Sequence, residues 1–434
     1  MKVHFIGIGG IGLSALARFL NYDGHEVSGS DMKSSPITKE LVNEGIKVSC
    51  PQDAKNICDD FDLVIYSAAV TDENPELIEA RLKQIRTLSR KEALPIILGD
   101  KKNYCVAGAH GKSTTSAILA SILRSSALIG AISKDFGSNF RYVNDLVSFE
   151  ADESDASFLL SNPYCAIVTN AEPEHMEYYH YDYDKFYEAY KTFIELSTIR
   201  VLNGEDEHIK KLDIKDAQFL YPSCDIKNLS FLLKDGEPCT RFELKDLGSF
   251  EVWGFGYHIA IDASLAILAA LNELDIKSIR ENLTNYKGIK KRFDLLQKSK
   301  NFALIDDYAH HPTEIEATMK SVELYDNLTN INKRVVIWQP HKYSRTHDNL
   351  EGFKRCFRRC DELVILPIWT IPGEQVIDID FEKEFSLYNP IFADSIKTLD
   401  GKVQIIKDKK VVKSYDEGII LGVGAGDITY QLRK

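Results

Sequence analysis

A lysine and two hydroxyl side chains, Lys112-Ser-Thr114, follow a glycine-rich turn that begins at Gly108. The apolar stretch 104–107 before the turn is typical of a buried strand, and the apolar positions after it repeat with helical spacing. In such a turn, backbone N–H groups and the positive end of the helix dipole face a phosphate group. A lysine adds charge near the β/γ oxygens, and a serine hydroxyl can ligate Mg²⁺. The stretch therefore predicts an ATP site formed by Gly108, Ala109, His110, Gly111, Lys112, Ser113 and Thr114.

The spacing of this turn differs from the common phosphate-binding motif G-x-x-x-x-G-K-[ST], because Val106 stands where that motif has its first glycine. The turn alone therefore leaves an alternative open, an ordinary glycine-linked connection between a strand and a helix.

Acidic residues gather at the end of the next expected strand, 147–151, in the run Glu150-Ala-Asp-Glu-Ser-Asp155. Carboxylates at the carboxyl end of a strand favour Mg²⁺ coordination, with Glu153 as the expected ligand. A charged loop without a metal is the alternative. His175 follows the strand expected over 166–170 and would face the same metal, although a lone histidine is more often structural.

A second glycine run, Gly7-Ile-Gly-Gly-Ile-Gly12, links an expected strand to a helix close to the N-terminus. It fits G-x-G-x-x-G, and Asp31 follows the next strand, 26–30, in position for a ribose hydroxyl. The same backbone geometry binds the diphosphate of any nucleotide, so the run does not single out NAD. The strand 63–66 ends in a small-residue loop at Ser67, where ligands lie in open α/β sheets. The residues expected at this nucleotide site are Gly9, Gly10, Ile11, Gly12, Asp31 and Ser67.

Polar clusters also follow the strands expected in the last third of the chain. The basic joint 287–293 is either a solvated face or a clamp for a phosphoryl group in transfer. Further on, the clusters 306–312 and 339–345 each stand just past an expected strand, which predicts one active-site face. The helix after the first of these clusters is expected to have Thr313 as N-cap and Glu316 at the capping-box position.

The length of 434 residues suggests about three domains, and strands alternate with helices throughout, which predicts α/β domains with parallel sheets. We expect a Rossmann-like N-terminal domain over 1–98, a central P-loop ATPase-like α/β domain over 99–291 and a Rossmann-like C-terminal domain over 292–434. The net charge of -12 argues against non-specific nucleic-acid binding. Eight scattered cysteines suit a reducing compartment, and no apolar run reaches ~18 residues, so we expect a cytoplasmic protein without membrane insertion.

Taken together, these motifs resemble those of the Mur ligases of peptidoglycan synthesis along the whole chain. The resemblance is carried by seven runs: His4–Gly12, Gly108–Ser113, Glu150–Phe158, Glu172–Met176, Asp306–Glu314, Gln339–Arg345 and Gly424–Asp427. It implies an ATP-dependent amide-bond ligase that joins L-alanine to the lactyl carboxylate of UDP-N-acetylmuramate. ATP would phosphorylate that carboxylate, and the L-alanine amine would attack the acyl phosphate and release phosphate.

The resemblance also assigns roles to residues. Two Mg²⁺ ions, or Mn²⁺ in their place, would be held by Ser113, Glu153 and His175. The residues that would act in catalysis are Lys112, His175 and Arg292. Beyond the phosphate loop, ATP would be contacted by His258 and Arg292. The first domain would take the UDP group. The muramyl and alanine side would be served by Tyr308, His310, His341, Tyr343 and Arg345.

One motif departs from the family. Its members usually carry His-Asn-x-x-Asn where this chain has His258-Ile-Ala-Ile-Asp262, at the start of an amphipathic helix expected over 258–274. An amide suited to adenine is thus replaced by Ile259 and a carboxylate.

Two other functions stay open. A ligase that recycles a murein tripeptide shares the glycine loops and a similar Asp-Asp-x-Ala-His-His-Pro run. An NAD-dependent oxidoreductase would rest on the N-terminal glycine run alone and would leave the phosphate loop and the carboxylates unexplained.

Overall fold

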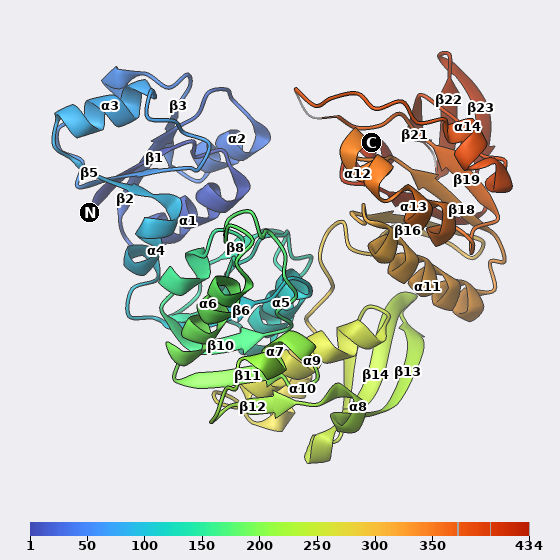
Figure 1. The fold of residues 1–434 in the computed structure, drawn as a ribbon, viewed down its shortest axis with the longest axis horizontal. Coiled ribbons are helices and arrows are strands. Elements are labelled where there is room, and N and C mark those ends of the chain that lie inside the picture. Colours follow the sequence, from blue (N-terminus) through green and yellow to red (C-terminus); the bar gives the residue numbers. More distant parts are fainter. Residues whose placement is uncertain (371–372, 400, 434) are drawn as a thin grey trace. The chain divides into compact units, whose positions relative to one another are not determined.

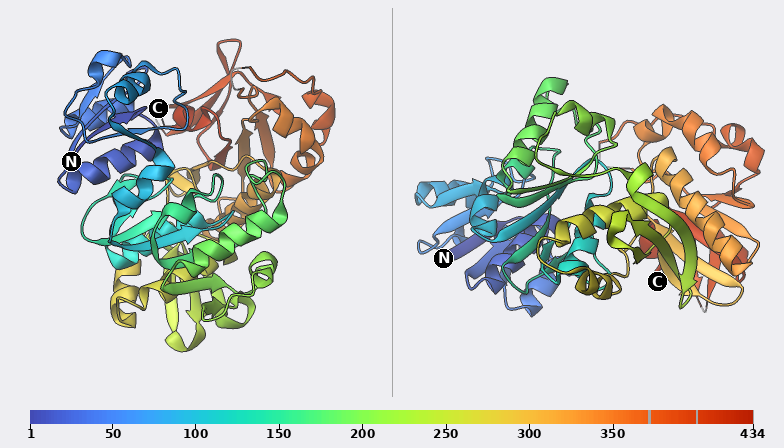
Figure 2. Two further views of the ribbon diagram at one scale, coloured as in Figure 1. Left: turned by 60° about the vertical axis from the view of Figure 1, so that its left-hand side comes forward. Right: turned by 90° about the horizontal axis from the view of Figure 1, so that it is seen from below.

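A computed structural model describes residues 1–370, 373–399 and 401–433 (Figures 1 and 2). Contacts divide the chain into two units, each of which is described by itself. The first unit comprises Met1–Leu229, Phe242–Val252 and His258–Lys287, and the second comprises Ser230–Arg241, Trp253–Tyr257 and Gly288–Lys434. Within the described residues, no helix combines the length and apolar character that crossing a bilayer requires.

The first unit begins with a five-stranded parallel sheet in the order β3-β2-β1-β4-β5. The strand order reverses beside β1, so the loop after β1 lies where ligands bind in open α/β sheets. The strands are β1 (Lys2–Ile6), β2 (Glu26–Ser30), β3 (Lys47–Ser49), β4 (Leu63–Tyr66) and β5 (Arg86–Ser89). The helices are α1 (Ile11–Tyr22), α2 (Pro36–Asn43), α3 (Pro75–Leu82) and α4 (Arg90–Leu98).

A seven-stranded sheet follows, in the order β12-β11-β10-β6-β9-β7-β8, parallel except for the β7–β8 pair. Its strands are β6 (Lys102–Ala107), β7 (Ser126–Leu128), β8 (Phe140–Arg141), β9 (Leu146–Glu150), β10 (Pro163–Val168), β11 (Ile199–Asn203) and β12 (Gln218–Leu220). The helices of this region are α5 (Lys112–Leu123), α6 (Tyr183–Glu195), α7 (Glu207–Lys211), α8 (Pro222–Asp225), α9 (Tyr257–Ala270) and α10 (Ile276–Leu283).

One apolar core runs through both sheets of the first unit. In Figure 1, α1 and α4 lie on the side of the first sheet that faces the second. The ring of Phe19 on α1 packs edge-on against Phe140 and Tyr142, and the same buried cluster continues to Phe158 and Phe193. The Asn139 side chain donates to the Ile11 carbonyl at 2.9 Å. A continuous apolar cluster and a hydrogen bond from a side chain to a backbone carbonyl therefore join the two sheets.

A small three-stranded sheet, in the order β13-β14-β15, contains residues that the contacts assign to both units. Its strands are β13 (Ile226–Lys234), β14 (Glu237–Leu244) and β15 (Ser249–Trp253).

The second unit contains a six-stranded sheet in the order β16-β17-β24-β18-β19-β20, parallel except for the β16–β17 pair. An antiparallel three-stranded sheet over 395–415 accompanies it. The strands are β16 (Asp294–Lys298), β17 (Phe302–Asp307), β18 (Arg334–Trp338), β19 (Glu362–Ile365), β20 (Ile391–Phe392), β21 (Ser395–Leu399), β22 (Lys402–Lys407), β23 (Lys410–Tyr415) and β24 (Gly418–Val423). The helices are α11 (Pro312–Thr329), α12 (Tyr343–Asp348), α13 (Leu350–Cys356), α14 (Phe381–Glu384) and α15 (Ile428–Leu432).

The predicted α/β class is confirmed, while two local predictions are wrong. The N-cap of α11 is His311, not Thr313, because Pro312 with its fixed φ occupies the first helical position; Glu314, not Glu316, completes the capping box. The helix expected over 258–274 is not amphipathic. Nearly every position of α9 from Ile259 onward is buried, so the helix has no solvent-exposed polar face there.

Candidate active site

Three adjacent strands of the seven-stranded sheet carry the predicted chemistry at their carboxyl ends. β6 lies between β9 and β10. The phosphate loop follows β6, the acidic run follows β9, and the loop that contains His175 follows β10. Parallel pairing brings these three loops to one edge of the sheet, as the sequence predicts.

The phosphate loop occupies the four residues between β6 and α5. Gly108 and Gly111 have φ angles of +141° and +82°, which residues other than glycine rarely adopt. A Cβ at Gly108 would lie 2.1 Å from the Thr169 hydroxyl, and one at Gly111 would lie 2.5 Å from an Asp262 carboxylate oxygen. Both glycines are therefore required by conformation and by space. α5 begins at Lys112 with Gly111 as its N-cap and with no side-chain cap, so its first N–H groups are available to an anion.

Lys112 is held at this loop by its own backbone and by a carboxylate. Its Nζ donates to the Gly108 carbonyl, and it lies 2.9 Å from Glu153 Oε1. Glu153 is almost fully buried, at 2% exposure, and its Oε2 has no hydrogen-bond partner. Burial raises the pKa of Glu153, although the Lys112 charge acts in the opposite direction. A buried carboxylate with a free oxygen beside a phosphate loop fits a bound divalent cation.

Glu150 is a residue that sequence reasoning placed in the acidic run without giving it a role. Its Oε1 accepts from the Ser113 hydroxyl at 2.9 Å, and its Oε2 accepts from the Gly130 amide at 2.7 Å. It therefore holds the serine predicted to ligate Mg²⁺. The signal available in the sequence was the position of Glu150 at the carboxyl end of a strand. Glu150 is the last residue of β9, and Glu153 lies three positions further on.

His175 lies at the same sheet edge, in the loop after β10. It is exposed, its backbone has a φ of +52°, and its Nδ1 is 3.8 Å from Glu177 Oε1. Across residues 1–370, 373–399 and 401–433, no group of three or more His, Cys, Asp or Glu side chains is gathered as a metal cluster. The ligand set of Ser113, Glu153 and His175 stays a prediction.

The loop after β10 supports the phosphate loop through His110. The Asn170 side chain accepts from the His110 amide at 3.1 Å and donates to the His110 carbonyl at 2.8 Å, while the Thr169 hydroxyl donates to the same carbonyl. The His110 ring lies 3.5 Å from carboxylate oxygens of Glu172 and Glu174. Sequence reasoning did not assign a role to Thr169 or Asn170, because their contact with His110 joins two different strands.

The departure from the family motif lies against the phosphate loop. Asp262 on α9 is buried beside Gly111, and burial raises its pKa well above the usual value. Ile259 is buried as well, whereas His258 in the first turn of α9 is exposed. The structure thus places the replaced motif beside the phosphate loop, with a carboxyl group whose pKa is raised by burial.

The N-terminal glycine loop lies at the strand reversal of the first sheet. Gly7 has a φ of +83°, and a Cβ there would meet the Ser67 hydroxyl at 2.7 Å, so the two predicted segments are adjacent. Asp31 also reaches the loop, where its Oδ2 accepts from the Gly9 amide at 2.9 Å. Arg90, for which the sequence predicted no role, also lies next to this loop. A Cβ at Gly12 would lie 3.6–3.8 Å from atoms of the Arg90 guanidinium.

The second unit gathers the residues predicted for the muramyl and alanine side. The Arg292 guanidinium lies over the ring of Tyr308, 5.8 Å from its centroid, and the rings of His310 and His341 make an edge contact at 6.2 Å. Arg345 in α12 donates to His341 Nδ1 at 2.9 Å. Burial and the Arg345 charge lower the pKa of His341 to about 4, so this imidazole is neutral at pH 7.

Tyr343 is the first residue of α12 and is half-buried. His310 is positioned by its own neighbours, since Glu314 Oε2 accepts from its amide at 3.0 Å.

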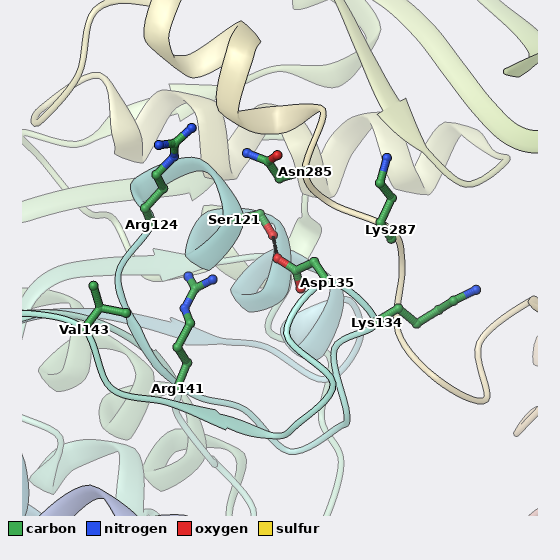
Figure 3. A pocket seen from close by; sticks show the side chains of 8 residues that line it. All are labelled: Ser121, Arg124, Lys134, Asp135, Arg141, Val143, Asn285 and Lys287. Carbon is green, nitrogen blue, oxygen red and sulfur yellow. Dashed lines mark hydrogen bonds between the residues drawn. The ribbon is translucent and has the colours of Figure 1, made fainter. Parts of the chain in front are cut away.

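The basic joint does not act as one cluster. Lys291 lies over the ring of Tyr430, Arg292 lies over Tyr308, and Lys287 belongs to the first unit. Figure 3 shows Lys287 at the rim of an open cavity of about 530 Å³ at the carboxyl end of α5. Its other lining residues are Ser121, Arg124, Lys134, Asp135, Arg141, Val143 and Asn285. None of the residues predicted for the active site lines this cavity.

Comparison with known proteins agrees with the site. The model of the Mur ligase family, catalytic domain, matches residues 2–102, and the model of the Mur ligase, glutamate ligase domain, matches residues 291–414. The chain belongs to the Mur ligase family.

Its relatives include UDP-N-acetylmuramate–L-alanine ligases, which match this chain along its full length. That of Campylobacter curvus is 57% identical over 433 residues, which cover 100% of this chain and 99% of the relative. The enzyme of Helicobacter pylori strain J99 is 51% identical over 436 residues, which cover 100% of this chain and 96% of the relative. The crystal structure of the UDP-N-acetylmuramate-alanine ligase from Thermotoga maritima has a TM-score of 0.79 at 28% identity, covering 100% of this chain and 97% of that one. A murein peptide ligase from Psychrobacter arcticus shares the fold, with a TM-score of 0.62 at 20% identity.

Proposed function

We propose that this protein is an ATP-dependent ligase that joins L-alanine to the lactyl carboxylate of UDP-N-acetylmuramate, in peptidoglycan biosynthesis, through an acyl phosphate. The observation that carries this proposal is the full-length identity of 51–57% to relatives named UDP-N-acetylmuramate–L-alanine ligase. The phosphate loop with Lys112 and the buried Glu153 supports the ATP-dependent step.

The residues of the phosphate loop serve phosphoryl transfer. The α5 amides and Lys112 bind the β and γ phosphates, and the Lys112 charge stabilises the negative charge that spreads over the transferring group. The lactyl carboxylate becomes an acyl phosphate, which has a better leaving group than the carboxylate itself. Arg292, in the second unit, is proposed to add positive charge to the same group.

Ser113, Glu153 and His175 are proposed to hold Mg²⁺, with Glu150 orienting the Ser113 hydroxyl. Bound Mg²⁺ would neutralise phosphate charge and orient the γ-phosphate. The number of ions, two in our proposal, and the use of Mn²⁺ belong to the same proposal.

The N-terminal glycine loop is proposed to bind the UDP diphosphate. Gly9 and Gly10 shape the turn before α1, and Ile11 and Gly12 supply N–H groups at the start of that helix, while Asp31 and Ser67 lie against the loop. Arg90 is the nearest cation and would pair with the phosphates. A dinucleotide-type fold thus serves a sugar nucleotide without redox chemistry.

The domain boundaries 1–98, 99–291 and 292–434 remain part of this proposal, as does a cytoplasmic location. The location rests on the eight free cysteines, which suit a reducing compartment, and on the need for ATP.

Phosphate release tests the proposal. Purified protein is assayed with ATP, Mg²⁺ and UDP-N-acetylmuramate, with L-alanine present or omitted, beside the variants Lys112→Ala and Lys39→Ala. Lys39 is an exposed lysine on α2 and serves as the matched control. Turnover that requires both substrates and Lys112, but not Lys39, is the expected result.

Two other outcomes would replace the proposal. Turnover only with L-Ala-γ-D-Glu-diaminopimelate in place of L-alanine would identify the recycling ligase. No phosphate release with either amine, together with NAD binding to the full chain, would return the oxidoreductase to consideration.

A further inference from the structure

The open cavity at the carboxyl end of α5 is lined mainly by basic side chains (Figure 3). Among the described residues that line it, four are basic and one is acidic: Arg124, Lys134, Arg141, Lys287 and Asp135. The Asp135 carboxylate accepts from the hydroxyl of Ser121 at 2.6 Å and from that of Ser133. The cavity therefore carries an excess of positive charge, although the chain as a whole has a net charge of -12.

This cavity is separate from the phosphate loop. α5 begins at that loop and ends at Leu123, so the 12 residues of the helix place the cavity about 18 Å away. Lys287, in the basic joint whose role the sequence left open, is the last residue of the first unit. The other lining residues belong to the same unit, so the cavity is formed within one unit.

Arg141 offsets the negative end of the α5 dipole, which would otherwise oppose an anion at this place. Its Nη2 donates to the Ala120 carbonyl at 2.6 Å, and its Nε donates to the Ser125 carbonyl at 2.9 Å. The guanidinium also lies over the Phe136 ring, 4.7 Å from the centroid. The fold therefore holds this cation in place before any ligand binds.

Arg124 and Lys287 are exposed at the rim of the cavity. Within the described residues, neither of them forms an ion pair with a carboxylate. In the view of Figure 3, the two arginines lie on one side of Ser121 and Asp135, and Lys287 lies on the other. Positive charge thus reaches the cavity from two sides, which suits a ligand with two anionic centres.

We infer that this cavity is an additional binding site for a small molecule that carries a diphosphate group. Arg124 and Arg141 contact one phosphoryl group, and Lys287 contacts the other. Guanidinium groups pair well with phosphate oxygens, and a diphosphate has an anionic centre for each side of the cavity. The inference does not depend on the proposed function, because none of these residues belongs to the predicted active site.

The size and lining of the cavity narrow the class of ligand. A volume of about 530 Å³ admits a small molecule, and the net charge of -12 opposes an extended nucleic acid. Val143 is the one apolar side chain among the described lining residues. The site therefore recognises the diphosphate itself and offers a nucleobase no aromatic ring for stacking.

Lysine protection in the full-length protein tests the inference. The protein is acetylated briefly with acetic anhydride in EDTA, at increasing concentrations of inorganic pyrophosphate, and each lysine is followed by mass spectrometry. Acetylation of Lys287 should fall by about 10-fold or more, because a bound phosphate keeps the amine protonated and covered. Lys39, exposed on α2, is the internal control and should react unchanged. Unchanged acetylation of Lys287 would overturn the inference.

Variants place the protection at this cavity. Arg124→Gln should raise the pyrophosphate concentration for half-protection by about 10-fold or more, since a charge-assisted contact is lost. Arg358→Gln, at an exposed arginine after α13, is the matched control and should stay within about twofold of the wild type. Lys112→Ala should be protected as the wild type is. A wild-type response of Arg124→Gln, or loss of protection in Lys112→Ala, would overturn the inference.

Two further ligands test the diphosphate assignment. ADP carries the same group on a nucleoside and should protect Lys287 at concentrations within about threefold of pyrophosphate, while orthophosphate should require about 10-fold more. Protection by ADP without protection by pyrophosphate would mean that the site requires a nucleoside. Equal protection by orthophosphate would mean that one anionic centre is enough. Either result would overturn the assignment.

Discussion

The two glycine loops of the first unit share a backbone plan and differ in what surrounds them. Each spans four residues, between β1 and α1 or between β6 and α5, and each leads into a 12-residue helix without a side-chain cap. Around Gly7–Gly10 stand one accepting carboxylate, Asp31, and one arginine, Arg90. Around Gly108–Gly111 stand a lysine and several carboxyl groups, of which Glu153 and Asp262 are buried; the others are Glu150 and, beside His110, Glu172 and Glu174.

This difference separates binding from chemistry. A loop that only holds a diphosphate needs N–H groups and a cation, because the charge on its ligand stays constant. A loop at which phosphate charge moves needs groups that respond to that movement, namely a mobile cation and carboxylates for metal ions. The same strand–loop–helix backbone thus supports either role, and the charged neighbours decide which one.

Metal removal should separate the loops most strongly. With EDTA, phosphate release should fall to background, because the second loop would lose the Mg²⁺ that we propose its carboxylates hold. Binding of UDP-N-acetylmuramate, measured by isothermal titration calorimetry, should remain within a few-fold of its value with Mg²⁺. A comparable loss of UDP-N-acetylmuramate binding would mean that the first loop also depends on a metal.

Removal of one cation from each loop should have different kinetic consequences. Lys112→Ala should lower kcat by about 10³-fold or more, the scale of a lost electrostatic contact to the transition state. Arg90→Ala should raise the KM for UDP-N-acetylmuramate roughly 10- to 100-fold and leave kcat nearly unchanged, since it removes a ground-state contact. Steady-state kinetics at varied UDP-N-acetylmuramate measures both, and a fall in kcat for Arg90→Ala would break the distinction.

A methyl group added to each loop should act unequally on stability. Gly111→Ala should cost about 2 kcal/mol or more, because φ is +82° and the Cβ would press on Asp262. Gly10→Ala, at a φ of −68° and with its nearest neighbour 3.6 Å away, should change stability by about 0.5 kcal/mol at most. Urea denaturation compares the two variants, and similar losses would show that the loops are equally strained.

The smallest effect concerns the buried carboxyl group behind each loop. Asp262 has a raised pKa, caused by burial, so its contribution to stability is present at low pH and is lost as pH rises through that pKa. Asp262→Asn should therefore gain stability relative to the wild type, by about 1 kcal/mol or more, as pH rises above the unfolded pKa of Asp, near 3.9.

Glu76 should behave in the opposite way. Burial raises the pKa of Glu76, but the nearby His4 ring and hydrogen bonds from Asn56 and Ser30 outweigh burial and lower it. The Ser30 carbonyl in turn accepts from the Gly7 amide. The stability that Glu76 supplies is present above its unfolded pKa, near 4.3, and is lost as pH falls through the folded value. The advantage of the wild type over Glu76→Gln should therefore shrink in acid. Thermal melts across pH 3–9 test both signs.

Local sequence patterns were sufficient for the elements that carry the loops. Glycines at fixed spacing after short apolar runs predicted β1–α1 and β6–α5, and the recurrence of polar clusters after strands predicted the shared sheet edge. These signals work because a strand, its turn and the following helix start are neighbours in sequence.

Contacts between residues far apart in the sequence could not be predicted from such patterns. Asn170 holds His110, Arg90 lies beside Gly12, and Glu374 lies beside His341, although each pair is separated by tens of residues. Only the packing of the sheets brings these partners together. The antiparallel strands β21, β22 and β23 were also missed, and for β23 the reason is that it is exposed at most positions and offers little apolar periodicity.

The apolar core shared by the two sheets of the first unit has a consequence for how this protein can be divided. A fragment of residues 1–98 would expose the Phe19 side of α1, and a fragment that starts at residue 99 would expose Phe140 and Tyr142. Each would carry an uncovered aromatic surface and tend to aggregate. Both sheets should instead melt in a single cooperative transition, so the proposed sugar-nucleotide and ATP sites should be gained and lost together.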